Sequence, residues 1–163
     1  MDEIREYGQA VLESDAFQAC KNIAHHRKTN VAAHELEVAK LALSMAHGLA
    51  RIGIRADMKT IVEIALCHDL GMIHRKEFFP YTTAWRHPVE SIRTAEQIIP
   101  LSWKVKNGIL FHMWPLSIIP PLSLEGTLVM WADKTVAVID RFSRKSASVS
   151  PYLQSKPTPE QEG

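Results

Sequence analysis

The chain has 163 residues, of which 46% are hydrophobic, and this length and composition suit one compact domain with a real core. The formal net charge is +1, from 19 Lys and Arg against 18 Asp and Glu, which argues against an extended nucleic-acid footprint and a polybasic membrane patch. The acidic N-terminus is unlike a signal peptide, and no apolar run approaches the roughly 18 residues that span a bilayer. We therefore expect a cytoplasmic protein with reduced thiols at Cys20 and Cys67.

Helical periodicity dominates the chain. Residues 2–22 predict one or two short helices. Asn30 is a suitable N-cap for a long helix that runs to about Arg51 and is ended by Gly53. The expected apolar stripe of this helix consists of Val38, Leu41, Met45, Leu49 and Ile52.

The middle of the chain predicts two further helices separated by a loop. Asp57 is a candidate cap for a helix that stops near Gly71. Residues 72–86 show no clear period and predict a loop. Pro88 then fits the first turn of a helix that reaches about Ile99.

The C-terminal part predicts two more helices and a polar tail. Ser102 caps a helix that ends near His112, and the prolines of MWPLSIIPPLS keep the following stretch non-helical. Ser123 starts a last long helix. Its expected buried residues are Leu124, Leu128, Trp131, Val136 and Ile139. We expect an all-α bundle of about six helices in residues 1–142, followed by a polar, disordered tail in residues 143–163.

Polar side chains fall on the inner faces of three of these helices. His34 precedes Val38 by four residues and so lies on an apolar stripe, and Asp133 lies on the inner face of the last helix. His68 and Asp69 end an otherwise apolar run. Titratable groups are costly to bury alone, and imidazoles with carboxylates are ligands of divalent metals. A metal ion is therefore the expected partner, and the two oxygens of Asp69 allow it to bridge two ions.

Other catalytic signatures are absent from the sequence. His34-Glu35 begins like the zinc-protease motif HExxH, but Val38 stands where the second histidine belongs. The paired Glu-x-x-His of di-iron carboxylate bundles, the phosphate-binding GxxxxGK[ST] loop, the GxSxG elbow and CxxC are all missing. Serine-nucleophile and P-loop chemistry are poorly supported.

The order His34, His68-Asp69, Asp133 resembles the HD superfamily of metal-dependent phosphohydrolases, a family of helical bundles with the pattern H…HD…D. The segments NVAAHELEVAKLALSMAHGL, EIALCHDLG and VMWADKTVAVID carry the resemblance, which covers roughly residues 25–142. His87 and His112 resemble the additional histidines of two-metal members. The HMWPL…PP…ADK segment resembles a group of small bacterial HD proteins.

The chain departs from two branches of that family. Met72 stands where cyclic-dinucleotide phosphodiesterases carry Lys and where the HDxxE motif of 5′-deoxynucleotidases carries Glu. The Gly-Tyr-Pro motif of the former is also missing. These departures argue against both activities.

The resemblance implies hydrolysis of a phosphoester of a small molecule, with nucleotides as one candidate class, by metal-activated water. It implies one or two divalent ions per chain, with Fe, Mn, Zn, Co, Ni and Mg all open. The implied metal ligands are His34, His68, Asp69, His87, His112 and Asp133. The implied catalytic residues are Asp69, His87, His112 and Lys134.

Alternative interpretations stay open. The protein is alternatively a non-catalytic metal- or nucleotide-binding sensor, or a di-iron oxygenase. His87 and His112 are alternatively ordinary helix-terminal residues, and Lys134 alternatively pairs with a carboxylate. His25, His26, His47 and His74 are expected to be structural or exposed, and Trp85, Trp103, Trp114 and Trp131 to belong to the core. Glu35 and Glu37 are expected on the solvated side of their helix.

Overall fold

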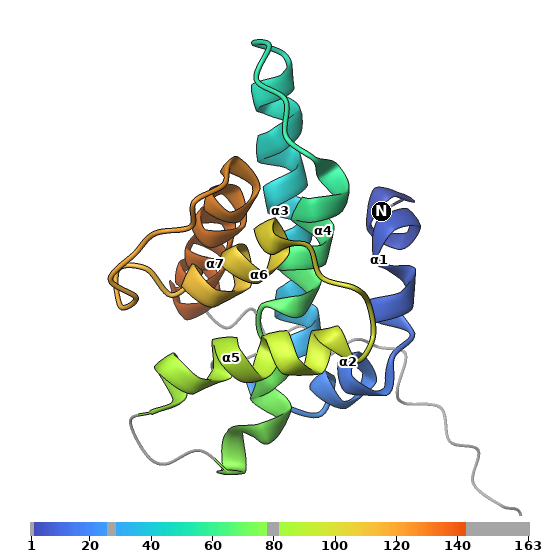
Figure 1. Ribbon diagram of the computed structural model, residues 1–163, viewed down its shortest axis with the longest axis vertical. Helices are drawn as coiled ribbons and strands as arrows, with labels where there is room; N and C mark the ends of the chain where they lie inside the picture. Colours follow the sequence, from blue (N-terminus) through green and yellow to red (C-terminus); the bar gives the residue numbers. More distant parts are fainter. Residues whose placement is uncertain (1, 26–28, 78–81, 143–163) are drawn as a thin grey trace, which may run out of the picture.

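The computed structural model describes residues 2–25, 29–77 and 82–142, and the predicted tail at 143–163 lies outside them. The described part is an all-α bundle, as predicted (Figure 1). Its elements are α1 (Asp2–Leu12), α2 (Asp15–Cys20), β1 (Ala24–His25), β2 (Thr29–Asn30), α3 (Val31–Ala50), α4 (Met58–Cys67), the 3₁₀ helix η1 (Leu70–Glu77), α5 (Thr83–Glu96), α6 (Trp103–Phe111) and α7 (Leu124–Phe142). The two-residue strands form an antiparallel pair that the sequence did not predict.

Side-chain caps begin most of these helices where they were predicted. The Asn30 side chain accepts a hydrogen bond from the Ala33 amide, and the Asp57 carboxylate accepts from the second and third residues of α4. Ser102 caps α6 in the same way. Gly53, with φ of 87°, takes the left-handed conformation that lets the chain turn after α3.

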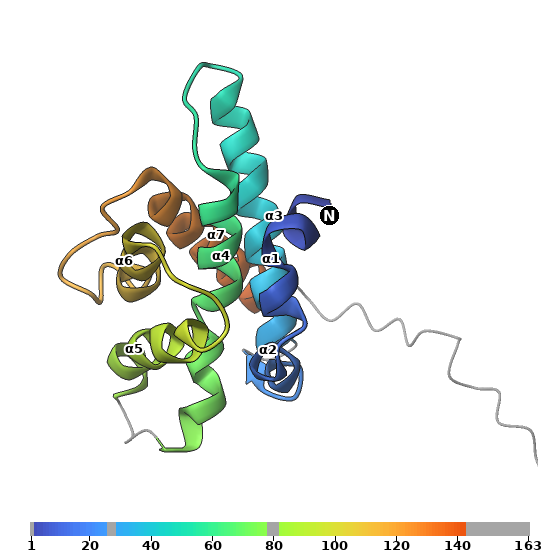
Figure 2. The same cartoon turned by 45° about the vertical axis from the view of Figure 1, so that its right-hand side comes forward.

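The helices α3 and α4 form the centre of the bundle. They lie side by side in both views, with α1 against one flank and α7 against the other (Figures 1 and 2). The helix α5 packs against η1 at one end of the pair, and α6 contacts both α5 and α7. Parts of the chain far apart in sequence therefore meet where α3, α4, α5, α6 and α7 converge.

The segment predicted as a loop at 72–86 is partly helical. The 3₁₀ helix η1 covers Leu70–Glu77, and α5 begins at Thr83, ahead of Pro88. The amides of Trp85 and Arg86 both donate to the carbonyl of Thr82, so a helical turn closes upstream of the proline. The prediction that Pro88 lies in the first turn is therefore wrong: it is the sixth residue of α5, and its missing N–H removes the helical hydrogen bond to the carbonyl of Ala84.

Several large apolar side chains predicted in the core are exposed. They are Ile52, Trp85, Trp103, Trp131 and Ile139. In α7 the buried face includes Leu128 and Val136, as predicted, together with Val129 and Ala132. Trp131 precedes Val136 by five residues, which is about 140° around a helix, so the two cannot share a narrow face. The prediction therefore joined an exposed tryptophan to residues of the buried face.

The described residues contain no helix with both the length and the apolar character needed to cross a membrane.

Candidate metal centre

Six of the predicted site residues gather in two clusters. His34, His68 and Asp133 form the first cluster, and Asp69, His87 and His112 form the second cluster. Within each cluster the potential ligand atoms all lie within 4.8 Å of one another. His34 comes from α3, Asp133 from α7 and His87 from α5, while His112 directly follows α6 and the His68-Asp69 pair connects α4 to η1.

The first cluster is centred on the carboxylate of Asp133. His34 Nε2 lies 2.9 Å from Asp133 Oδ1, and His68 Nε2 lies 3.8 Å from the same oxygen. Both imidazoles are fully buried, and the Asp133 side chain is partly buried, with 15% of it exposed. Three helical segments therefore direct two ring nitrogens and one carboxylate oxygen at a common point.

The second cluster is centred on Asp69, whose two oxygens face different clusters. Oδ1 lies 3.3 Å from His87 Nε2 and 3.7 Å from His112 Nε2. Oδ2 lies 3.8 Å from His68 Nε2, which belongs to the first cluster. The two rings of the second cluster approach each other with 3.1 Å between their Nε2 atoms. Asp69 thus lies between the two clusters, with one oxygen toward each.

Backbone hydrogen bonds orient two of the histidines. His68 Nδ1 lies 2.9 Å from the carbonyl oxygen of Ala65, and His112 Nδ1 lies 2.7 Å from that of Ile109. A carbonyl oxygen only accepts, so each Nδ1 carries the proton and donates it. A neutral ring then has its lone pair on Nε2, directed at the cluster, which is the arrangement found for metal-ligating histidines.

The electrostatics of the centre favour positive charge. Burial disfavours the charged form of the His68 ring, but Asp69 and Asp133 outweigh burial and raise the pKa of that ring to about 10. Burial also disfavours charged carboxylates, yet neighbouring histidines hold the pKa values of Asp69 and Asp133 well below their usual range. At His112, burial and the adjacent His68 lower the pKa to about 4. Two anionic carboxylates in a dry site create the potential that a cation needs.

The donor set fits a divalent cation. His68 Nε2 is buried and makes no hydrogen bond, because 3.8 Å to each carboxylate is too long for one. Ligand atoms held about 2.0–2.2 Å from one ion lie up to about 4.4 Å apart. The observed separations of 2.9–3.8 Å are within this limit. An ion would therefore satisfy a buried nitrogen that the protein itself leaves without a hydrogen bond.

Lys134 lies beside the second cluster through a backbone contact. Its Nζ donates a hydrogen bond of 3.0 Å to the carbonyl oxygen of His112, and its side chain is partly buried, which lowers the lysine pKa. The carbonyl of a helix C-terminus has no partner within its own helix, so the ammonium group satisfies an otherwise unpaired acceptor. This places a cation next to His112.

The prediction that Glu35 lies on the solvated side of its helix is wrong, whereas Glu37 is exposed as expected. The Glu35 side chain is 0% exposed, and neither carboxylate oxygen makes a hydrogen bond of ordinary geometry. Burial raises its pKa well above the usual range, against the opposing effect of His68. Glu35 follows Val31 by four residues and precedes Val38 by three, so the helical period contained the signal that places it inside.

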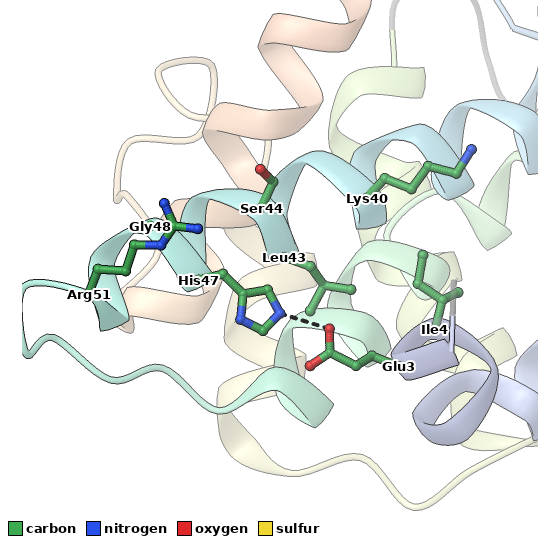
Figure 3. A pocket seen from close by; sticks show the side chains of 8 residues that line it. All are labelled: Glu3, Ile4, Lys40, Leu43, Ser44, His47, Gly48 and Arg51. Carbon is green, nitrogen blue, oxygen red and sulfur yellow. Dashed lines mark hydrogen bonds and ion pairs between the residues drawn. The ribbon is translucent and has the colours of Figure 1, made fainter.

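The remaining histidines with described side chains lie outside both clusters. His47 is exposed and pairs with Glu3 at 2.8 Å, and His74 is partly buried. The side chain of His25 and all of His26 lie outside the described part of the chain. His47 lines a surface cleft of about 510 Å³ between α1 and α3, and Figure 3 shows the Glu3–His47 pair with Lys40 on α3 and Arg51 directly after that helix. None of the six clustered residues lines this cleft.

A helical bundle that joins H, HD and D from separate helices defines an HD-type metal site, and comparison with known families agrees. The family model of the HD domain matches residues 31–138. The chain therefore belongs to the HD domain family, whose members are mostly metal-dependent phosphohydrolases. Neither the curated proteins nor the solved structures include a match to this chain.

Proposed function

We propose that this protein is a metal-dependent phosphohydrolase that cleaves a phosphoester of a small molecule, with nucleotides as one candidate class, in the cytoplasm. The position of Asp69 is the observation that carries the proposal. Its two oxygens face two separate His-containing clusters, and phosphoester hydrolysis benefits from paired ions about 3.5–4 Å apart. The net charge of +1 supports a small substrate rather than an extended nucleic acid.

The proposed ligand assignment follows the two clusters. His34, His68 and Asp133 would hold one ion, His87 and His112 would hold a second, and Asp69 would be shared between the two. When bound, the ions supply a water of lowered pKa and neutralise phosphoryl oxygens. Fe, Mn, Zn, Co, Ni and Mg remain candidates, because His and Asp donors suit several of them.

The protein's own groups have complementary roles in this proposal. The buried histidine rings exclude bulk water from the centre and present fixed nitrogen donors, so little reorganisation is needed when substrate arrives. Lys134 donates one N–H to the His112 carbonyl oxygen. Its ammonium group has two further N–H donors that can bind a substrate phosphate oxygen. If a single ion is bound, His87 and His112 become candidates for contact with the substrate or for proton donation to the leaving group.

The substitution Asp69→Asn tests the proposal. It preserves side-chain size but removes the negative charge that both clusters share, so we expect metal content to fall from two ions per chain to less than one. Turnover of a panel of phosphomonoesters and nucleotides should fall at least about 1,000-fold, since both ions would lower the activation barrier of hydrolysis. Asp140→Asn is the matched control. Asp140 lies on α7, belongs to neither cluster and accepts a hydrogen bond from Thr29.

The same measurements separate the alternatives. Metal and tight nucleotide binding without turnover in the wild type would identify a sensor. Bound iron with oxygen consumption would identify an oxygenase. Wild-type protein that binds no divalent ion would contradict the proposed phosphohydrolase outright.

A further inference from the structure

Gly71 brings η1 into direct backbone contact with α5. The Gly71 amide donates a hydrogen bond of 2.8 Å to the hydroxyl oxygen of Ser91, and both residues are buried. This bond connects segments that are 20 residues apart in sequence. It lies outside both clusters, so the metal assignment above does not account for it.

The approach at Gly71 leaves no room for a side chain. A Cβ atom there would lie 2.5 Å from the backbone nitrogen of Ser91 and 2.9 Å from the carbonyl carbon of Glu90, and closer still to the carbonyl oxygen of His87. These are backbone atoms of a helix, which cannot rotate away as a flexible side chain can. Any residue larger than glycine must push η1 and α5 apart.

The contact is placed to control one distance in the second cluster. Gly71 follows Asp69 by two residues, and Ser91 lies one helical turn after His87. The separation of Asp69 Oδ1 and His87 Nε2, 3.3 Å, therefore depends on how closely η1 approaches α5. We infer that Gly71 and Ser91 are positioning residues that keep Asp69 and His87 close enough to bind the second ion. This inference rests on the proposed function.

The first cluster does not depend on this contact in the same way. His34 and Asp133 come from α3 and α7, which pack directly against each other. His68 is oriented by the Ala65 carbonyl within its own segment. Loosening the η1–α5 contact thus weakens the second ion and spares the first, whereas general destabilisation affects both.

Gly71→Ala is the first test, made on the full chain loaded with Mn²⁺. We expect metal content by elemental analysis to fall from two ions per chain to one, with the helical circular dichroism retained. Gly48→Ala is the matched control, because an added Cβ at Gly48 in α3 meets no atom within 4 Å. The control should keep two ions.

Ser91→Ala tests the hydrogen bond without adding atoms, and it serves if Gly71→Ala fails to fold. It leaves the Gly71 amide buried without its acceptor, and we expect the affinity for the second Mn²⁺ to fall about 10- to 100-fold in a calorimetric titration. The affinity for the first Mn²⁺ should change less than about 3-fold. Ser44→Ala on the exposed face of α3 is the control.

The outcomes distinguish this inference from the proposed function. Loss of one ion in the Gly71 variant, or selective weakening of one ion in the Ser91 variant, supports the positioning role. Wild-type-like binding of two ions by both variants overturns it and leaves the phosphohydrolase proposal intact. A wild-type chain that binds fewer than two ions overturns the inference together with the two-ion assignment.

Discussion

His68 and His112 each have one ring nitrogen committed to the backbone. Their Nδ1 atoms donate to carbonyl groups three residues earlier, which determines the tautomer and the direction of Nε2. The residue spacing that creates this bond is local, so it forms with the helix itself. Each ring is therefore preorganised before the partner helices supply the carboxylates.

Lys134 is the residue whose role is most directly testable by substitution. Lys134→Met removes the donor to the His112 carbonyl, so we expect the free energy of unfolding to fall by about 1 kcal/mol. If the ammonium also contacts substrate phosphate, KM for the best phosphoester should rise about 10-fold or more. Thermal unfolding and steady-state kinetics measure the two effects. A lower Tm with unchanged KM would restrict Lys134 to its backbone contact and contradict the substrate role.

At the scale of elements, the residue at which a helix begins and the face that it buries together decide where its site residue points. In α3 the buried face combines His34 and Glu35 with small residues, including Ala39, Ala42 and Ala46. Small side chains let neighbouring backbones approach, which brings short donors such as His and Asp within reach of one another. The cap at Asn30 sets where this helix begins, four residues before His34.

Asn30→Ala tests the contribution of that cap. The Asn30 side chain accepts a 2.8 Å hydrogen bond from the Ala33 amide, and its loss should destabilise the protein by about 1 kcal/mol. For a domain of this size the expected drop in Tm is about 2–4 °C. Asn30→Ser keeps a capping oxygen and should recover most of the loss, while Asn22→Ala, at an exposed position, serves as the control. Equal Tm values for Asn30→Ala and the wild type would contradict the capping role.

At the scale of the whole molecule, Glu125 on α7 connects this helix to α4 and α6. Its Oε1 accepts hydrogen bonds from the Asp57 amide at the start of α4, 3.1 Å away, and from Lys104 Nζ in α6, 3.2 Å away. Burial would raise the pKa of Glu125, but the Asp57 amide and Lys104 outweigh burial and lower that pKa. The ionised form is thus favoured by the folded state.

Glu125→Gln should therefore change stability in a pH-dependent way. Because the folded-state pKa lies below the unfolded value near 4.5, the extra stability from ionised Glu125 is fully present above that value. It is lost as the pH falls through the folded-state pKa. We expect the variant to be less stable than the wild type by about 1–3 kcal/mol at pH 7, with the difference shrinking below pH 4.5. Urea unfolding at pH 7 and below pH 4 measures this, and a difference independent of pH would refute the assignment.

Local patterns in the sequence were sufficient for most of the fold. The caps at Asn30, Asp57 and Ser102 and the non-helical stretch after His112 depend on residues close together in the chain, and all are confirmed. The family is likewise carried by the order of H, HD and D. The burial of Glu35 was also available from the helical period, but its charge argued the other way.

The sequence by itself determined that these helices form and that His34, His68, Asp69 and Asp133 face inward, because helix periodicity and capping act over a few residues. Only the tertiary structure decided that the two oxygens of Asp69 face different clusters and that Gly71 must let η1 touch α5. It also decided that Trp131 stays exposed while Val129, Met130 and Ala132 join Leu128 on the buried face of α7. Distances between helices depend on how whole faces pack together, and no periodicity within one helix contains that information.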